Sequence, residues 1–186
     1  PLGHLVLGTR KTVSALDRTA LRRNFTERYG TPQITLVACG QLDAPALLKQ
    51  AQRLSARWPR QPFTRALRAH APRPALTVHH DPALTRQQLM LCAPGLSAAD
   101  PLWEAAQVLA EIIGGDNGRL YWALLDSGLC ESADFAHLEF AEVGTFEGGF
   151  TCDPERAQEA LGAFVKVLRD VQRGVSPQEV RRAARK

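Results

Sequence analysis

Residues 129–154 read LCESADFAHLEFAEVGTFEGGFTCDP, and the fold class follows from this segment. Two strand-like segments, about 129–140 and 144–152, are joined by a short connection across Glu142-Val143-Gly144. A turn this tight makes the two strands antiparallel neighbours. Asp153-Pro154 then begins a helix, since proline is favoured in the first helical turn. The pattern predicts an antiparallel pair of strands that leads directly into a helix.

Amphipathic helices precede and follow this pair of strands. Asp100-Pro101 places a capping residue and a first-turn proline before apolar residues at helical spacing, which end at Gly114-Gly115. Ser176-Pro177-Gln178-Glu179 has the residues of a capping box at the start of a last helix. The remaining expected elements are helices over 118–126 and 153–173 and strands over 76–80 and 87–93. The order predicts an α+β fold, a two-layer sandwich with a largely antiparallel sheet and helices packed on one face.

The first third of the chain has a different pattern. Asp17 caps a helix over 18–29, residues 34–39 are predicted to form a buried strand, and Asp43 begins a helix that reaches Trp58. Residues 59–75 hold four prolines, which cannot donate to helix or ladder hydrogen bonds, so this segment is predicted to be an extended linker. We therefore expect three parts. They are residues 1–58, a connecting arm or the end of a preceding domain; the Pro/Arg-rich linker 59–75; and residues 76–186, a C-terminal α+β domain truncated at its end.

The composition argues against nucleic-acid and membrane partners. The hydrophobic fraction of 45% and the charged fraction of 23% are ordinary for a globular protein. No stretch approaches the roughly 18 consecutive apolar residues that a membrane span needs. The net charge is +4, but the arginines are spread over helix faces, and the aromatic fraction of 6% provides no base-stacking platform. We expect neither a nucleic-acid partner nor a membrane span.

No metal site or nucleophile is expected within the chain. The sequence contains no HExxH, HxxEH or GxSxG motif. His79 and His80 are the only clustered histidines, and adjacent residues on a strand point to opposite faces, so the two cannot easily bind one metal. The four cysteines are far apart and without a CxxC pair, and we expect them to be buried free thiols: Cys39, Cys92, Cys130 and Cys152.

Two further features are interpreted as structural. The glycine-rich run Gly114–Arg119 follows a helix and lacks the lysine of a phosphate-binding loop, so it is interpreted as a helix cap and a tight turn. The basic residues near the end of the chain, Arg181-Arg182 and Arg185-Lys186, are interpreted as a solvated helix face with favourable charge at the helix C-terminus. Neither pattern predicts a chemistry of its own.

A series of landmarks is more specific than any single motif, and it runs along nearly the whole chain in order. The landmarks are residues 1–9, Tyr29-Gly30-Thr31-Pro32-Gln33, residues 34–40 with Asp43, residues 109–115, Gly118-Arg119-Leu120-Tyr121, Gly149–Glu155 and Gly174–Ser176 with Glu179. The series resembles the C-terminal, non-zinc domain of the pitrilysin / mitochondrial processing peptidase family of zinc endopeptidases, the inverzincins. By this resemblance, residues 1–9 correspond to the segment that joins the catalytic and non-catalytic halves.

The resemblance implies that the parent protein cuts peptides with a zinc ion held by an HxxEH motif and a distant Glu in the preceding domain. This fragment then has no cofactor of its own and is inactive alone. Its implied roles are to wall the substrate chamber and to hold the catalytic domain of the same chain or a partner subunit. A homo- or heterodimer and a peptide substrate are the implied partners. The alternative is an inactive peptidase-like scaffold subunit that pairs with a catalytic partner.

Site residues follow from the resemblance only in part. In some family members this domain supplies an Arg and a Tyr to the substrate, and the matching positions here are Leu125 and Glu131, on either side of Gly128-Leu129. This departure implies either a domain from the zinc-carrying half or a degenerate member. Arg119 and Tyr121 are retained, and they are the predicted substrate contacts, although a structural role at a helix start explains them equally.

Overall fold

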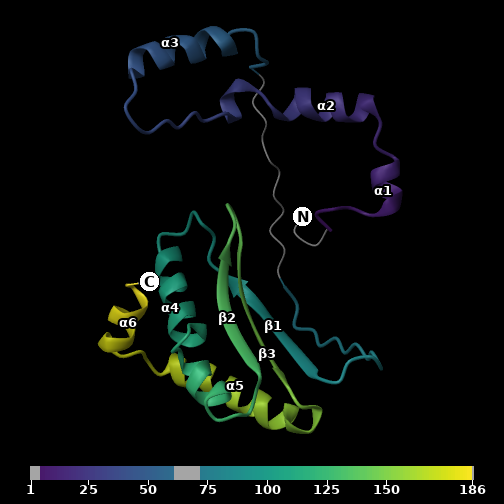
Figure 1. The fold of residues 1–186 in the computed structure, drawn as a ribbon, viewed down its shortest axis with the longest axis vertical. Helices are drawn as coiled ribbons and strands as arrows, with labels where there is room; N and C mark the ends of the chain where they lie inside the picture. The colour runs from purple at the N-terminus through teal and green to yellow at the C-terminus, as the bar shows by residue number, and fades with distance from the viewer. Residues whose placement is uncertain (1–4, 61–71, 186) are drawn as a thin grey trace. The chain divides into compact units, whose positions relative to one another are not determined.

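The computed structural model describes residues 5–60 and 72–185, and these form two compact units, one on each side of the gap (Figure 1). Most of the predicted linker, residues 59–75, lies outside the described residues. None of the helices in the described parts of the chain is both long and apolar enough to cross a bilayer.

The second unit is built on a sheet of three antiparallel strands. The strands are β1 (Gln87–Gly95), β2 (Ser132–Glu139) and β3 (Gly144–Cys152), in the spatial order β1-β3-β2. Gly148 at the centre of β3 lies opposite Leu91 on one side and Phe135 on the other. The hairpin of β2 and β3 confirms the antiparallel pair predicted from residues 129–152.

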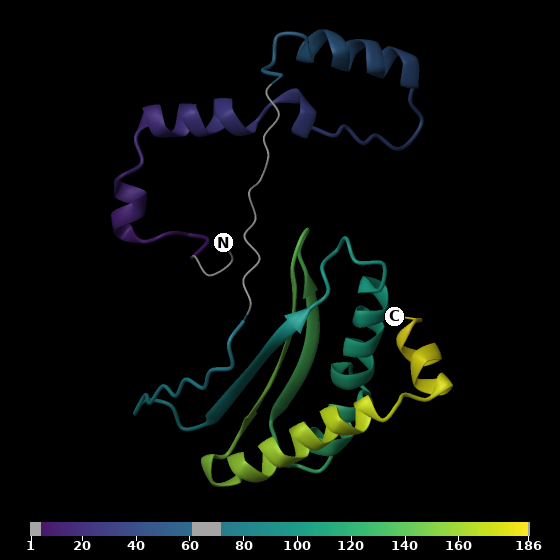
Figure 2. The same cartoon turned by 180° about the vertical axis from the view of Figure 1, so that it is seen from behind.

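Helices cover one face of this sheet, as Figures 1 and 2 show from opposite sides. α4 (Trp103–Gly114) packs against β2, α5 (Ala157–Gln172) packs against β3, and α6 (Pro177–Ala183) lies beside α4. Two short elements complete the layer: the π-helical turn η2 (Tyr121–Leu125) and the 3-10 turn η3 (Pro154–Arg156). This arrangement confirms the predicted α+β fold with helices on one sheet face.

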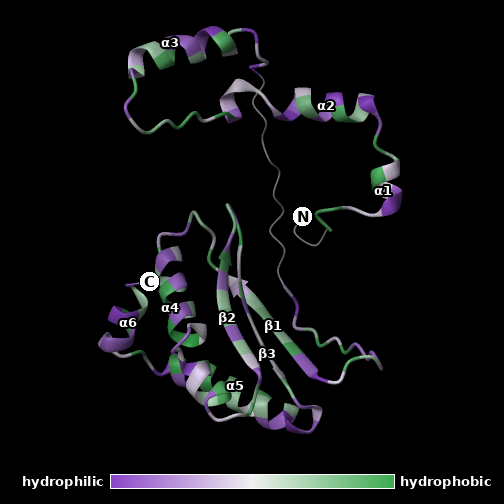
Figure 3. Cartoon of the chain, viewed as in Figure 1, coloured by the Kyte–Doolittle hydropathy of each residue, from purple (hydrophilic) through white to green (hydrophobic). Residues whose placement is uncertain are grey.

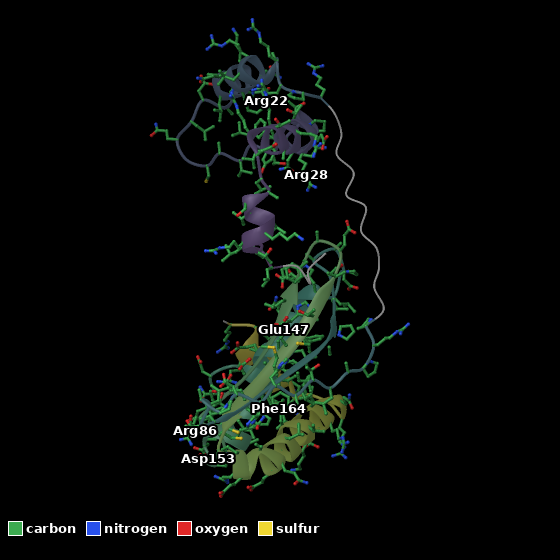
Figure 4. The ribbon with its side chains drawn as sticks, turned by 90° about the vertical axis from the view of Figure 1, so that its right-hand side faces the viewer. Arg22, Arg28, Arg86, Glu147, Asp153 and Phe164 are labelled. Atoms are coloured by element: carbon green, nitrogen blue, oxygen red, sulfur yellow. The ribbon has the colours of Figure 1, made fainter. Side chains whose placement is uncertain are left out.

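The core lies between this helical layer and the sheet. Phe164 of α5 is fully buried, and its ring lies 5.9 Å from that of Phe150 on β3 (Figure 4). Figure 3 shows apolar and polar stretches alternating along α4 and α5, as expected for helices that bury one side. The buried cluster consists of Ile113, Leu120, Leu124, Leu129, Cys130, Phe150, Cys152, Ala160, Phe164 and Val167.

One glycine fixes the distance between the helical layer and the sheet. α4 ends at Gly114 against the backbone of β2, where a Cβ atom would lie only 2.8 Å from the Cα atom of Phe135. Real Cβ atoms do not approach a backbone so closely. Glycine therefore lets α4 contact the strand directly.

The first unit is helical. It contains α1 (Arg10–Ser14), α2 (Arg18–Arg28), the 3-10 turn η1 (Thr31–Gln33) and α3 (Ala44–Ser55). The Asp17 carboxylate accepts a hydrogen bond from the Ala20 amide at 2.6 Å, and the Asp43 carboxylate accepts one from the Ala46 amide at 3.0 Å. Both aspartates are therefore N-caps, as the sequence predicted.

Two predicted strands do not form. Residues 34–39 are extended but unpaired, and their side chains are exposed, with Val37 at 84%. Residues 76–80 also have no ladder, and the paired strand begins only at Gln87. A strand needs a neighbour for its backbone N–H and C=O groups. Among the described residues of the first unit there is no other strand, so the β-branched sequence alone does not produce a ladder.

Candidate functional site

The turn between α4 and η2 positions Arg119. The Gly118 amide donates to the Gly115 carbonyl at 2.7 Å, and a Cβ on Gly118 would lie 2.6 Å from the Ile113 oxygen. The glycine-rich run therefore closes the end of α4, as predicted, and turns the chain directly into Arg119.

Arg119 forms a two-pronged ion pair with Glu179 of α6. Its Nε lies 2.7 Å from Oε1 and its Nη2 lies 3.1 Å from Oε2. Nη2 also donates to the Gly174 carbonyl at 3.0 Å. A guanidinium and a carboxylate match in this geometry, which makes the pair specific as well as strong. The contact joins the start of η2 to the start of α6.

Glu179 has a second role as the last residue of the predicted capping box. Its Oε2 accepts from the Ser176 amide at 2.7 Å, and its own amide donates to Ser176 Oγ at 3.2 Å. The Arg119 guanidinium, with the Ser176 amide as the next contributor, lowers the pKa of Glu179 to about 2. Glu179 in turn raises the pKa of Arg119. Both groups are therefore charged at neutral pH, and α6 is held by charge-assisted hydrogen bonds.

The other positions named from the sequence have separate surroundings. Tyr121 is partly buried, and its ring meets the Trp122 ring edge-on at 5.1 Å. Leu125 packs against the buried cluster. Glu131 is exposed and forms an ion pair with Arg86, which also pairs with Asp153 (Figure 4). Arg119 and Tyr121 therefore share one short segment, whereas Glu131 belongs to an ion-pair network at the ends of the strands.

A hollow of about 570 Å³ lies between the start of η2 and α6, and we call it the arginine groove. Its lining is Asn117, Gly118, Arg119, Trp122, Ser176, Gln178, Glu179, Arg181, Arg182 and Arg185. Arg181, Arg182 and Arg185 are exposed and form no ion pair with other residues that the structure describes. The sequence predicted only a solvated helix face here, because the facing residues 117–122 lie about sixty positions earlier and no local spacing connects the two.

The described residues do not fit a zinc ion. Across 5–60 and 72–185, no group of three or more His, Cys, Asp or Glu side chains lies close enough to hold a metal. His79 and His80 are exposed. His137 is buried. Its Nε2 lies within hydrogen-bond distance of the Leu96 backbone, 3.1 Å from the amide nitrogen and 3.0 Å from the carbonyl oxygen, and its Nδ1 lies 3.9 Å from Glu139 Oε2. A catalytic zinc needs three protein ligands.

The cysteines divide into two pairs. Cys130 and Cys152 are buried, as predicted, and burial raises the pKa of Cys130 to about 11, so its thiol is unreactive at neutral pH. The prediction was wrong for Cys39 and Cys92, which are exposed. Cys39 follows the segment that forms no strand. Cys92 lies on β1 at a position that alternates with the helix-facing Leu91 and Ala93.

No helix or strand among residues 72–185 covers the sheet face opposite the helices (Figures 1 and 2). Met90 on β1 is 78% exposed, and Glu147 lies at the middle of β3 (Figure 4). The same face presents residues at the alternate positions of the three strands: Gln88, Met90, Cys92, Ser132, Asp134, Ala136, Leu138, Thr145, Glu147 and Thr151. The face is therefore mostly polar, with isolated apolar side chains.

The second unit is an α+β domain with helices on one sheet face, and its described residues contain no cluster of metal-binding side chains. The family model of the Peptidase M16 inactive domain matches residues 15–186. The chain belongs to this family, and the resemblance inferred from the sequence is confirmed.

Similar proteins are named zinc proteases. An uncharacterized zinc protease of Mycobacterium tuberculosis is 26% identical over 185 residues, which cover 93% of this chain and 41% of that protein. One from Streptomyces coelicolor is 27% identical over 196 residues, which cover 98% and 42%. The chain thus spans about two fifths of the length of these relatives.

Solved structures share the fold. The peptidase M16 inactive domain from Pseudomonas fluorescens matches with a TM-score of 0.81 at 19% identity, over 98% of this chain and 45% of that one. A protease from Helicobacter pylori matches with a TM-score of 0.76 at 12% identity, over 95% and 45%. A chain of complex III from Candida albicans matches with a TM-score of 0.71 at 18% identity, over 98% and 46%.

Proposed function

We propose that this chain is the non-catalytic domain of a zinc metalloendopeptidase, in which its open sheet face lines the substrate compartment. The observation that carries the proposal is the two-sided sheet. Its helix-facing side holds the core, and its other side is polar and uncovered within the unit. Relatives named zinc proteases are more than twice as long as their match to this chain, which leaves room for a separate zinc-binding domain.

The chemistry of the open face suits contact with peptides of varied sequence. Ser132, Thr145 and Thr151 offer hydroxyl groups for hydrogen bonds, and Met90 offers a flexible apolar surface that adapts to different side chains. In this proposal residues 1–58 connect to the catalytic part, 59–75 form the linker and 76–186 form the chamber wall. The catalytic domain, or a partner subunit that carries it, holds the zinc. Arg119 and Tyr121 belong to the helical layer, so a substrate contact at these two residues lies outside the open face.

The experiment is a peptidase assay of the full-length parent with its zinc content measured after dialysis. We expect about one zinc per chain, and we expect Met90→Arg to raise the KM for peptides with zinc content unchanged. Lys166→Ala, on the exposed side of α5, is the control that leaves KM unchanged. An unchanged KM in the Met90→Arg protein contradicts the role of the open face.

The alternative function is an inactive, peptidase-like scaffold subunit. The observation in its favour is that Leu125 packs in the core and Glu131 is held by Arg86, at the two positions where the resemblance places an Arg and a Tyr. A full-length parent without zinc and without peptidase activity supports this alternative over the first proposal.

A further inference from the structure

The arginine groove has an excess of positive charge that the fold itself does not use. Four arginines and one glutamate line it. Arg119 is matched by Glu179, which leaves Arg181, Arg182 and Arg185 without a carboxylate partner in the described chain. These three arginines are exposed, and none forms an ion pair with another described element, so they do not stabilise the fold in that way.

The three arginines are placed to act together. Arg181 and Arg182 are neighbours on α6, and Arg185 lies in the turn just after it. All three face the hollow that the segment Asn117–Trp122 closes on the other side. Each guanidinium presents a planar fork of donors that matches a carboxylate. The cluster therefore favours a ligand that carries several separated carboxylates.

The rest of the lining favours a peptide. Asn117 and Gln178 add amide groups, which can both donate and accept hydrogen bonds as a peptide backbone requires. Trp122 is 56% exposed and adds an apolar ring. A single aromatic side chain does not make the row of stacking platforms that single-stranded nucleic acid uses. The volume of about 570 Å³ fits a ligand of a few residues.

The groove is also held in shape before any ligand arrives. The Arg119–Glu179 pair ties its two walls together, and the Ser176 capping box fixes the start of α6. The backbone around the groove therefore loses little conformational freedom when a ligand binds. From this charge, lining and rigidity we propose that the arginine groove binds an acidic peptide segment through its carboxylates. The proposal concerns binding by this chain and does not depend on peptidase activity of the parent.

The test is fluorescence anisotropy of the purified chain with a short fluorescein-labelled peptide in which Glu and Asp alternate with Gly and Ser. A peptide with Gln and Asn in their place is the ligand control. The test variant carries Arg181→Glu, Arg182→Glu and Arg185→Glu. The matched control carries Arg18→Glu, Arg22→Glu and Arg23→Glu, which changes the charge equally at three exposed arginines gathered on α2.

We expect the acidic peptide to bind, the amide peptide to bind at least about tenfold more weakly, and binding to weaken as salt is added. We expect the α6 variant to lose about tenfold or more in affinity and the α2 variant to keep it. Equal losses in the two variants overturn the proposal, because they indicate attraction to net charge alone. Equal binding of the two peptides, or no binding, also overturns it. Preferential binding of a single-stranded oligonucleotide or of polyphosphate at the same arginines assigns the groove to a phosphate polymer instead.

Discussion

The two units of this chain differ in what stabilises their helices. α2 begins at the Asp17 side-chain cap but buries no residue, whereas α5 has no side-chain cap and buries Ala160, Phe164 and Val167. In the first unit, side chains cap the helix starts, and no residue of α1, α2 or α3 is buried. In the second unit, a helix without a side-chain cap packs on a sheet. Capping fixes where a helix starts, and burial supplies most of its stability.

Removing one aromatic ring from each unit should destabilise the two units very differently. Phe164→Ala empties a fully buried site, and we expect a loss of about 3–5 kcal/mol in the free energy of unfolding of the second unit. Phe25→Ala in α2 removes a ring that is 60% exposed, and we expect a loss below about 1 kcal/mol. Urea titration measures the free-energy loss in each variant, and hydrogen exchange of the β3 and α2 amides shows which unit is destabilised. Equal effects contradict the assignment of the core.

Two glycines of the second unit should respond to substitution by alanine in opposite directions. Gly114→Ala places a methyl group against the backbone of Phe135, and we expect a loss of about 1–3 kcal/mol as α4 shifts away from β2. Gly162→Ala on α5 meets nothing within 4 Å, and we expect a gain of about 0.5–1 kcal/mol from helix propensity. Thermal unfolding of the two variants checks the opposite signs. A stabilised Gly114→Ala protein disproves the close packing of α4 on β2.

The Arg119–Glu179 pair gives the second unit a pH dependence. Because the folded-state pKa of Glu179 is lowered to about 2, its contribution is complete above the ordinary carboxylate pKa and is lost as pH falls toward 2. Glu179→Gln is expected to lower stability by about 1–2 kcal/mol at pH 7. The difference from the wild type should shrink steadily below about pH 4.5. A difference that is constant across this range indicates that the carboxylate charge contributes nothing.

The sequence predicted the elements whose signals are local. The capping aspartates 17 and 43, the Ser176 box, the glycine turn after α4 and the β2–β3 hairpin are all found where their residues indicated. The failed strand predictions required a distant partner. Residues 34–39 have strand-forming side chains, but the described part of their unit, residues 5–60, offers no neighbouring strand. The arginine groove and the Arg86 ion pairs join segments about 45 to 67 residues apart, and no spacing in the sequence brings them together.

Ion pairs that differ in exposure should differ slightly in their contribution to stability. Arg86 reaches both Glu131 and Asp153, but all three side chains are about half exposed, with Arg86 at 45%. Exposed pairs contribute about 0–1 kcal/mol and are screened by salt. We expect Arg86→Ala to cost less than about 1 kcal/mol, and we expect this cost to fall in high salt. The less exposed Arg119–Glu179 pair, at 24% and 22%, should keep more of its effect in the same titration. An equal salt response of the two pairs means that both are surface contacts, and α6 would then be held to the unit mainly by its packing beside α4.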